Sequence, residues 1–176
     1  IRDVERSRGL GDVYKRQTSD GALWLGTARG ARRCDPGGES CGEEIEVDPQ
    51  LRVDPVVTGL VEGDQGHIWL GTWGAGVYRY DPSGVTPVEG LAGEAVFAIA
   101  HDSTGNLWFG TKKGAFRRQP DGRLEQVVSG APVLAIAEDS QRAVWLGTND
   151  GVVRFFDGET QSFGAVDGLI GHTVQA

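Results

Sequence analysis

The chain contains no methionine, two cysteines and three histidines, and its basic residues are in the minority. It has no apolar run near the roughly 18 residues that a membrane-spanning helix needs. His67, His101 and His172 do not form a pair at metal-site spacing, and no second cysteine pair completes a zinc site. Acidic residues outnumber basic ones by 25 to 17, and there is no basic stripe. We therefore expect no metal, no cofactor and no nucleic-acid partner.

Residues 1–17 look foreign to the rest of the chain. Asp12-Val13-Tyr14-Lys15-Arg16-Gln17 can be back-translated as GAT GTG TAT AAG AGA CAG, which resembles a transposon-end adapter used in sequencing libraries. The alternative is a native polar segment. Because the chain also begins with Ile1 and lacks methionine, we expect a fragment of a longer protein with a non-native segment over 1–17.

One five-residue phrase occurs four times, with its tryptophans 45, 39 and 37 residues apart. The copies are Leu23-Trp24-Leu25-Gly26-Thr27, Ile68-Trp69-Leu70-Gly71-Thr72, Leu107-Trp108-Phe109-Gly110-Thr111 and Val144-Trp145-Leu146-Gly147-Thr148. A constant period of about 40 residues is typical of repeat architectures.

Each repeat predicts four short strands separated by turns. In the third repeat the expected strands are 96–100, 107–111, 115–118 and 123–128, and Gly114 sits where a tight turn calls for positive φ. Four antiparallel strands per ~40 residues match the blade of a β-propeller. A β-sandwich gives no reason for an identical phrase in each unit, and a β-solenoid has a shorter period.

The predicted fold is therefore all-β, with four four-stranded antiparallel blades of a larger, seven-bladed propeller. The expected blades span 18–55, 56–95, 96–132 and 133–173, and 174–176 begin the next blade. The first repeat is expected to lack its inner strand, whose place the foreign segment takes.

Each residue of the phrase has a physical role in this fold. The large aromatic rings fill the wedge between neighbouring blades. The glycine permits close backbone approach, and the threonine hydroxyl can satisfy an amide of the following turn. We therefore interpret Trp24, Trp69, Trp108 and Trp145 as structural core.

The two cysteines, Cys34 and Cys41, flank a loop rich in Gly, Asp, Pro and Glu. A disulfide closing this loop would suit an oxidising compartment. Two free thiols are the alternative, and the sequence leaves both open.

The repeats differ most in the turn between their second and third strands. In propellers these turns share a face with the connections from the fourth strand to the next blade. An aromatic beside polar groups suits sugar rings and hydroxyls, whereas the alternative is a plain solvated turn. The candidate ligand-binding residues are Arg29, Trp73, Lys112, Lys113, Asn149 and Asp150, together with His172 on a connection between blades.

The stretch from Asp102 to Gly114 resembles the two-component regulator propeller repeat, and so does that from Gly66 to Pro82. The first repeat departs from this pattern by its Cys34–Cys41 insertion, and the fourth has Arg142 in place of a turn glycine. The resemblance implies the extracytoplasmic sensor of a bacterial histidine kinase, periplasmic or extracellular, which often recognises carbohydrate fragments. It also implies that the remaining blades and a downstream signalling domain are partners, and a homodimer is a further expectation.

Two other classes of function compete with a sensor. Asp64-Gln65-Gly66-His67-Ile68-Trp69 partly resembles the Asp-box of sialidases, and the repeats also resemble those of streptogramin-degrading lyases. We interpret Asp64, Asp102 and Asp139 as turn formers and expect no catalysis in this segment. A ligand-free interaction scaffold is the third alternative.

Overall fold

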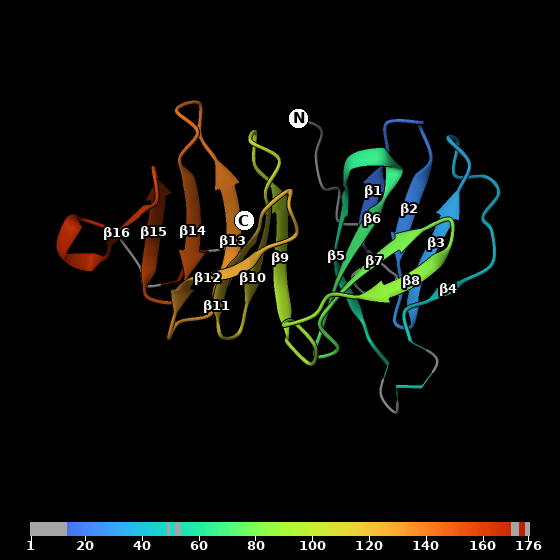
Figure 1. Ribbon diagram of the computed structural model, residues 1–176, viewed down its shortest axis with the longest axis horizontal. Helices are drawn as coiled ribbons and strands as arrows, with labels where there is room; N and C mark the ends of the chain where they lie inside the picture. The colour runs from blue at the N-terminus through green and yellow to red at the C-terminus, as the bar shows by residue number, and fades with distance from the viewer. Residues whose placement is uncertain (1–13, 49, 52–53, 170–172, 175–176) are drawn as a thin grey trace. The chain divides into compact units, whose positions relative to one another are not determined.

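The computed structural model describes residues 14–48, 50–51, 54–169 and 173–174. These residues form four four-stranded antiparallel sheets and two short 3-10 helices, η1 (Asp64–Gly66) and η2 (Ala165–Asp167) (Figure 1). The first two sheets form one compact unit and the last two form another, with the division after Gly93. The predicted all-β class and its four-stranded antiparallel blades are confirmed.

Every strand pairs with its neighbour in sequence, so each blade is a simple meander. The first blade consists of β1 (Lys15–Gln17), β2 (Leu23–Gly26), β3 (Gly30–Cys34) and β4 (Ile45–Glu46). The second consists of β5 (Val57–Glu62), β6 (Ile68–Thr72), β7 (Val77–Asp81) and β8 (Gly84–Pro87). The third consists of β9 (Val96–His101), β10 (Leu107–Thr111), β11 (Gly114–Arg118) and β12 (Leu124–Ser129). The fourth consists of β13 (Val133–Glu138), β14 (Val144–Thr148), β15 (Gly151–Phe156) and β16 (Glu159–Phe163).

The first blade differs from its sequence prediction, because it does have an inner strand. Lys15, Arg16 and Gln17 pair antiparallel with Leu25, Trp24 and Leu23. Strand β1 has three residues, whereas β5, β9 and β13 have six each. Backbone pairing at this edge needs only free N–H and C=O groups, so a polar segment can occupy it without the apolar side chains of the other inner strands.

The repeated phrase forms the second strand of every blade, and its tryptophan supplies the core. Trp24, Trp69 and Trp108 are buried, and Trp145 is half-buried. Within each unit the tryptophan of one blade packs on an aromatic ring of the next blade. Trp24 lies 5.1 Å from Tyr80 and Trp108 lies 5.1 Å from Phe155, measured between ring centroids. Trp24 and Trp108 thus fill the space between neighbouring blades, as tilted or edge-on pairs do in protein cores.

An arginine on the third strand faces each tryptophan across the sheet. The register pairs Trp24 with Arg33, Trp69 with Arg79, Trp108 with Arg117 and Trp145 with Arg154. The Arg117 guanidinium lies 5.7 Å from the centroid of Trp108 and 4.8 Å from that of Phe155. This places a cation between two rings of neighbouring blades, which adds cation–π attraction to apolar burial.

The glycine of the phrase lets the next blade begin directly against it. A Cβ on Gly26 would lie 2.9 Å from Val57 Cγ1, and one on Gly110 would lie 2.7 Å from the Val133 carbonyl oxygen. Real Cβ atoms do not approach this closely, so any other residue would push the neighbouring blade away. The predicted close approach is therefore confirmed.

Candidate functional site

The threonine that ends the phrase organises the turn between the second and third strands. Thr111 Oγ1 donates to the Gly114 carbonyl at 3.0 Å and accepts the Lys113 N–H at 3.1 Å. Thr148 does the same with Gly151 at 3.0 Å and the Asp150 N–H at 3.1 Å. The predicted hydroxyl-to-amide bond is confirmed, and it leaves the side chains at the turn tip free to vary.

These turns lie beside the start of the inner strand in their own blade. The Trp73 N–H donates to the Val56 carbonyl at 2.8 Å, and the Lys112 N–H donates to the Ala95 carbonyl at 3.0 Å. The second and third blades therefore present their second-to-third turn and their incoming connection together, as expected from the sequence. In the second blade this brings two exposed apolar side chains to one place, Trp73 (61% exposed) and Val56 (41% exposed).

The other candidate residues are exposed at equivalent turns. Lys112, Asn149 and Asp150 lie at turn tips, and Arg29 forms an ion pair with Glu46 at 3.3 Å. His172 lies outside the described residues. The structure groups Lys112 with Lys113 on one turn and Asn149 with Asp150 on the next.

Lys113 has a buried partner. Its side chain is 71% exposed and contacts the carboxylate of Glu94, which is only 8% exposed. Glu94 lies on the connection that leads into β9. Sequence reasoning missed it because the repeats do not share an acidic residue at this position. A buried carboxylate whose ion partner is an exposed lysine is a site where a cationic or hydroxyl-bearing ligand can compete.

At the opposite end of the third and fourth blades, an aspartate binds the tryptophan of the phrase. Trp108 Nε1 donates to Asp102 Oδ2 at 2.8 Å, and Trp145 Nε1 donates to Asp139 Oδ2 at 2.7 Å. Asp102 also accepts the backbone N–H groups of Thr104 and Asn106, so it is a turn former as predicted. The indole bond was not predicted from the sequence.

The pKa values of these aspartates reflect that structural role. Burial acts to raise the pKa of Asp102, but the hydrogen bonds from Trp108 and its neighbours outweigh it and hold the pKa below its ordinary value. The bond from Trp145 likewise lowers the pKa of Asp139. Both carboxylates are therefore charged hydrogen-bond acceptors at neutral pH, which is opposite to the raised pKa of a general acid.

A second contact, repeated in both units, links adjacent blades through a glutamate and a serine. Glu62, the last residue of β5, accepts the Ser19 N–H at 2.7 Å and the Ser19 hydroxyl at 2.6 Å. Glu138, the last residue of β13, accepts the Ser103 N–H at 2.8 Å and its hydroxyl at 2.7 Å. We call this pair of hydrogen bonds the Glu–Ser clamp. Aligning the repeats could have revealed the recurring serine and glutamate, but not that they pair across blades.

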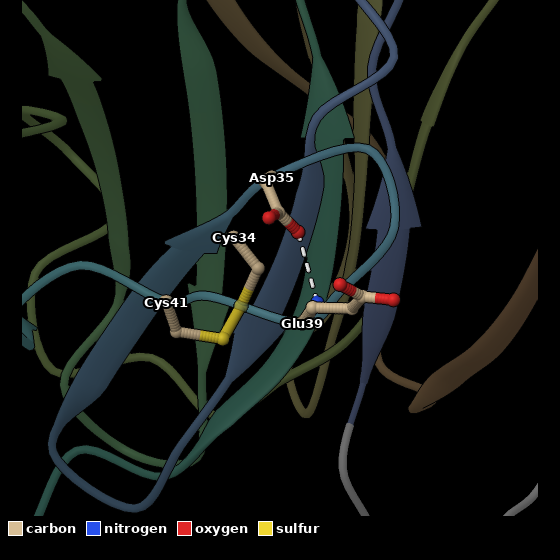
Figure 2. Close-up of a disulfide and its surroundings, with 4 residues drawn as sticks. All are labelled: Cys34, Asp35, Glu39 and Cys41. Carbon is tan, nitrogen blue, oxygen red and sulfur yellow. Dashed lines mark hydrogen bonds between the residues drawn. A yellow bond between two sulfur atoms is a disulfide. The ribbon is translucent and has the colours of Figure 1, made fainter.

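The Cys34–Cys41 pair, left open by the sequence, is a disulfide in the structure. Figure 2 shows it closing the loop in which Asp35 Oδ1 accepts the Glu39 N–H at 2.9 Å. The same two cysteines form an isolated antiparallel bridge at the end of β3. The disulfide thus fixes the base of the insertion that sets the first blade apart from the others.

No three His, Cys, Asp or Glu side chains in the described ranges come together as metal ligands. No helix in that part of the chain has both the length and the apolar character needed to cross a membrane.

Three stretches of the chain match the two component regulator propeller family, residues 51–74, 90–113 and 128–150. Each stretch contains an inner strand, the phrase and the following turn. A comparison with curated protein sequences finds no match.

Solved structures with the same fold include two extracellular domains from B. thetaiotaomicron. The domain of the hybrid two component system BT4673 is 18% identical with a TM-score of 0.77, over 98% of this chain and 25% of that one. The domain of BT3049 is 18% identical with a TM-score of 0.68, over 92% and 25%. YCF48 from Cyanidioschyzon merolae is 14% identical with a TM-score of 0.66, over 97% and 64%. The chain spans about a quarter of the two B. thetaiotaomicron domains.

At these identities the solved structures establish the fold, and the sequence matches establish the kind of repeat. Three stretches of the chain are similar to repeats of the two component regulator propeller family, and the chain folds as four-stranded β-propeller blades.

Proposed function

We propose that this chain is part of a ligand-sensing propeller in a two component signalling protein, on the extracytoplasmic side of a bacterial membrane. The family match and the likeness to extracellular domains of hybrid two component systems support this proposal. The segment itself binds and does not catalyse. Its partners are the remaining blades, a downstream signalling domain and, in a dimer, a second copy.

The observation that carries the proposal is the contrast between a constant frame and variable turns. Tryptophan, glycine and threonine recur at fixed positions. The tryptophan and glycine serve the packing of the blades, and the threonine holds the geometry of the turn. The residues directly after the threonine are exposed and differ in every blade. Function is carried by such loops on rigid scaffolds.

The chemistry of these turns favours an oligosaccharide. Trp73 offers an exposed flat ring beside Val56, which suits the apolar face of a sugar. Lysine, asparagine and aspartate on the equivalent turns of the third and fourth blades supply donors and acceptors for hydroxyl groups. His172 and Arg29 complete the set of residues that we propose for ligand contact.

A glycan array followed by thermal-shift titration of the full-length ectodomain tests this proposal. A ligand at 100 times its Kd is expected to stabilise the folded state by about 2.7 kcal/mol. Trp73→Ala should abolish that stabilisation. Phe156→Ala is the matched control, because Phe156 is also exposed but ends β15, at the far end of its blade from the second-to-third turn.

Failure of all plant, host and microbial oligosaccharides to stabilise the ectodomain would favour the interaction-scaffold alternative. Turnover of a glycoside or a streptogramin by the purified protein would replace the sensor by an enzyme.

A further inference from the structure

The outer strand of the fourth blade, β16, is a continuous and exposed sheet edge. It pairs with β15 alone, and residues 159–162 are exposed (Figure 1). All five of its residues pair with β15 without a break in register, from Glu159 opposite Phe156 to Phe163 opposite Val152. An edge of this kind presents unpaired backbone groups to solvent and is a template for another strand.

The hairpin geometry fixes which backbone groups of β16 point outward. Asp157–Gly158 form a two-residue turn with φ angles of +51° and +82°, as in a type I′ hairpin. Glu159 and Phe156, which flank this turn, are therefore a hydrogen-bonded pair, and such pairs alternate along the strands with pairs that are not bonded. The N–H and C=O groups of Thr160 and Ser162 accordingly face away from β15. Within the described residues these groups have no hydrogen-bond partner.

The outer strands of the other described blades are protected against pairing with another strand. β4 has only two residues. On β12 the register shifts between the partners of Ala115 and Phe116, which marks a bulge. β8 ends at Pro87, and the bond from the Val88 N–H to the Val77 carbonyl places Pro87 at an outward position, where it has no N–H to donate. Short strands, bulges and prolines are the usual protection of sheet edges, and β16 has none of them.

Strand β16 is complementary to a second copy of itself. In an antiparallel pair with a two-fold axis at Gln161, Thr160 of one copy lies opposite Ser162 of the other. Every outward N–H and C=O group of both strands then has a partner. The threonine and serine hydroxyls share one face, which is a favourable cross-strand pair, and Glu159 lies opposite Phe163 rather than opposite another acid.

Two exposed apolar side chains flank the strand. Phe156 (41% exposed) precedes the turn into β16, and Val166 (97% exposed) lies on η2 after it. In the antiparallel arrangement the Phe156 end of one copy meets the Val166 end of the other. Association would therefore remove apolar surface from water at both ends of the paired strands, as well as pairing their backbones.

We propose that β16 binds β16 of a second copy of this protein, antiparallel and about a two-fold axis at Gln161. Such a contact uses the same surface on both copies, as most homodimers do. It rests on the proposed function only in naming the surface for the second copy. Because it uses none of the residues proposed for ligand contact, its failure would leave the ligand-sensing proposal standing.

Cysteine cross-linking of the full-length ectodomain tests the two-fold axis. Gln161→Cys places two thiols on residues directly opposite each other in a pair that is not hydrogen-bonded, with about 4.5 Å between Cα atoms, which a disulfide can span. Thr86→Cys is the matched control, because Thr86 is exposed and lies opposite Arg79 on β7 as Gln161 lies opposite Arg154 on β15. With oxidised glutathione as the oxidant, Gln161→Cys should form covalent dimers at least about tenfold faster than Thr86→Cys, because docking raises the effective concentration of its thiols.

Two further variants separate edge pairing from folding. Ser162→Pro removes an outward N–H without removing a bond to β15, as Pro87 does in β8, so it should lower the cross-linking of Gln161→Cys to the control level. Gln161→Lys, made without the cysteine, places like charges opposite each other across the axis. In the parent protein the exchange of the Ser162 amide with solvent should slow as the protein concentration rises, whereas in Gln161→Lys it should stay fast.

Equal cross-linking of Gln161→Cys and Thr86→Cys would overturn the proposal. So would exchange at Ser162 that is fast at every protein concentration, because the edge would then be unpaired. Exchange that is slow at every concentration would also overturn it, by assigning the edge to another segment of the same protein.

Discussion

At the scale of single residues, the aspartates that precede the phrase are the least predictable part of the fold. Their turn-forming role follows from local sequence, because an aspartate side chain can accept the backbone N–H two residues on and so favours an Asx-type turn. The bond from the Trp108 indole to Asp102 depends on how the strand folds back, which local sequence does not specify. The result is a polar anchor for a side chain that sequence patterning assigns to the apolar core.

Removing this anchor should destabilise the third blade. Asp102→Ala would leave the indole N–H of Trp108, which is 1% exposed, without its acceptor. A buried unpaired donor costs about 1–3 kcal/mol. Urea unfolding should therefore show a loss of that size. Asp121→Ala, which removes an exposed aspartate that accepts the Arg123 N–H, should stay within about 0.5 kcal/mol of the parent. Equal losses in the two variants would contradict a special role for Asp102.

Asp20 makes stability depend on pH in the acid range. Hydrogen bonds from Thr18, the Ala22 N–H and Arg33 lower its pKa from 3.8 to about 2. A carboxyl whose folded-state pKa is depressed stabilises the fold above the unfolded-state value of 3.8 and loses that effect as the pH falls towards about 2. The difference in unfolding free energy between the parent and Asp20→Asn should thus shrink from about pH 5 to about pH 2. A difference that stays constant over this range would show that the charge of Asp20 does not matter.

At the scale of strands and turns, the repeat period predicted the blades well, because four strands per ~40 residues allow few other arrangements. The prediction was wrong for the first inner strand. Lys15–Gln17 has no apolar pattern, and its pairing with β2 rests on backbone groups that sequence composition does not report. The glycines that open the third strands were predictable as turn residues, but their second constraint, contact with the fourth strand, was not.

Gly114 illustrates that second constraint. Its φ is +136°, and a Cβ there would lie 1.9 Å from the Val128 carbonyl oxygen on β12. Gly114→Ala should therefore destabilise the chain by more than about 1 kcal/mol, because both the backbone conformation and the strand pairing resist it. Gly164→Ala is the control, since its nearest atom is 3.7 Å away and its φ is −135°. Thermal unfolding that gives the same shift for both variants would exclude the proposed clash.

The disulfide should stabilise the first blade by restricting its unfolded chain. Reduction of Cys34–Cys41, which are seven residues apart, is expected to cost about 2 kcal/mol in unfolding free energy. Denaturant unfolding with and without reductant measures this cost. A Cys34→Ala/Cys41→Ala double variant should not respond to reductant. A parent chain that is equally insensitive would mean that the disulfide contributes nothing to stability.

At the scale of the whole molecule, sequence reasoning located the variable turns but not the groups that lie beside them. Trp73 and Lys113 were identified because they break the repeat pattern, whereas Val56 and Glu94 became visible only when the chain brought each connection next to its turn. The Glu–Ser clamp was missed for the same reason, because its two members belong to different repeats. Contacts between repeats depend on blade packing, which a single repeat does not encode.

The phrase builds the packing frame of the blades, and we propose that the turns that follow it form the binding surface. Hydrogen exchange of the full-length ectodomain with and without the strongest ligand from the glycan array tests this separation most directly. We predict ligand-dependent protection at the turns containing Trp73, Lys112–Lys113 and Asn149–Asp150, with no change at the turns between third and fourth strands. Protection confined to the latter turns, or to the outer strands β8, β12 and β16, would contradict the account.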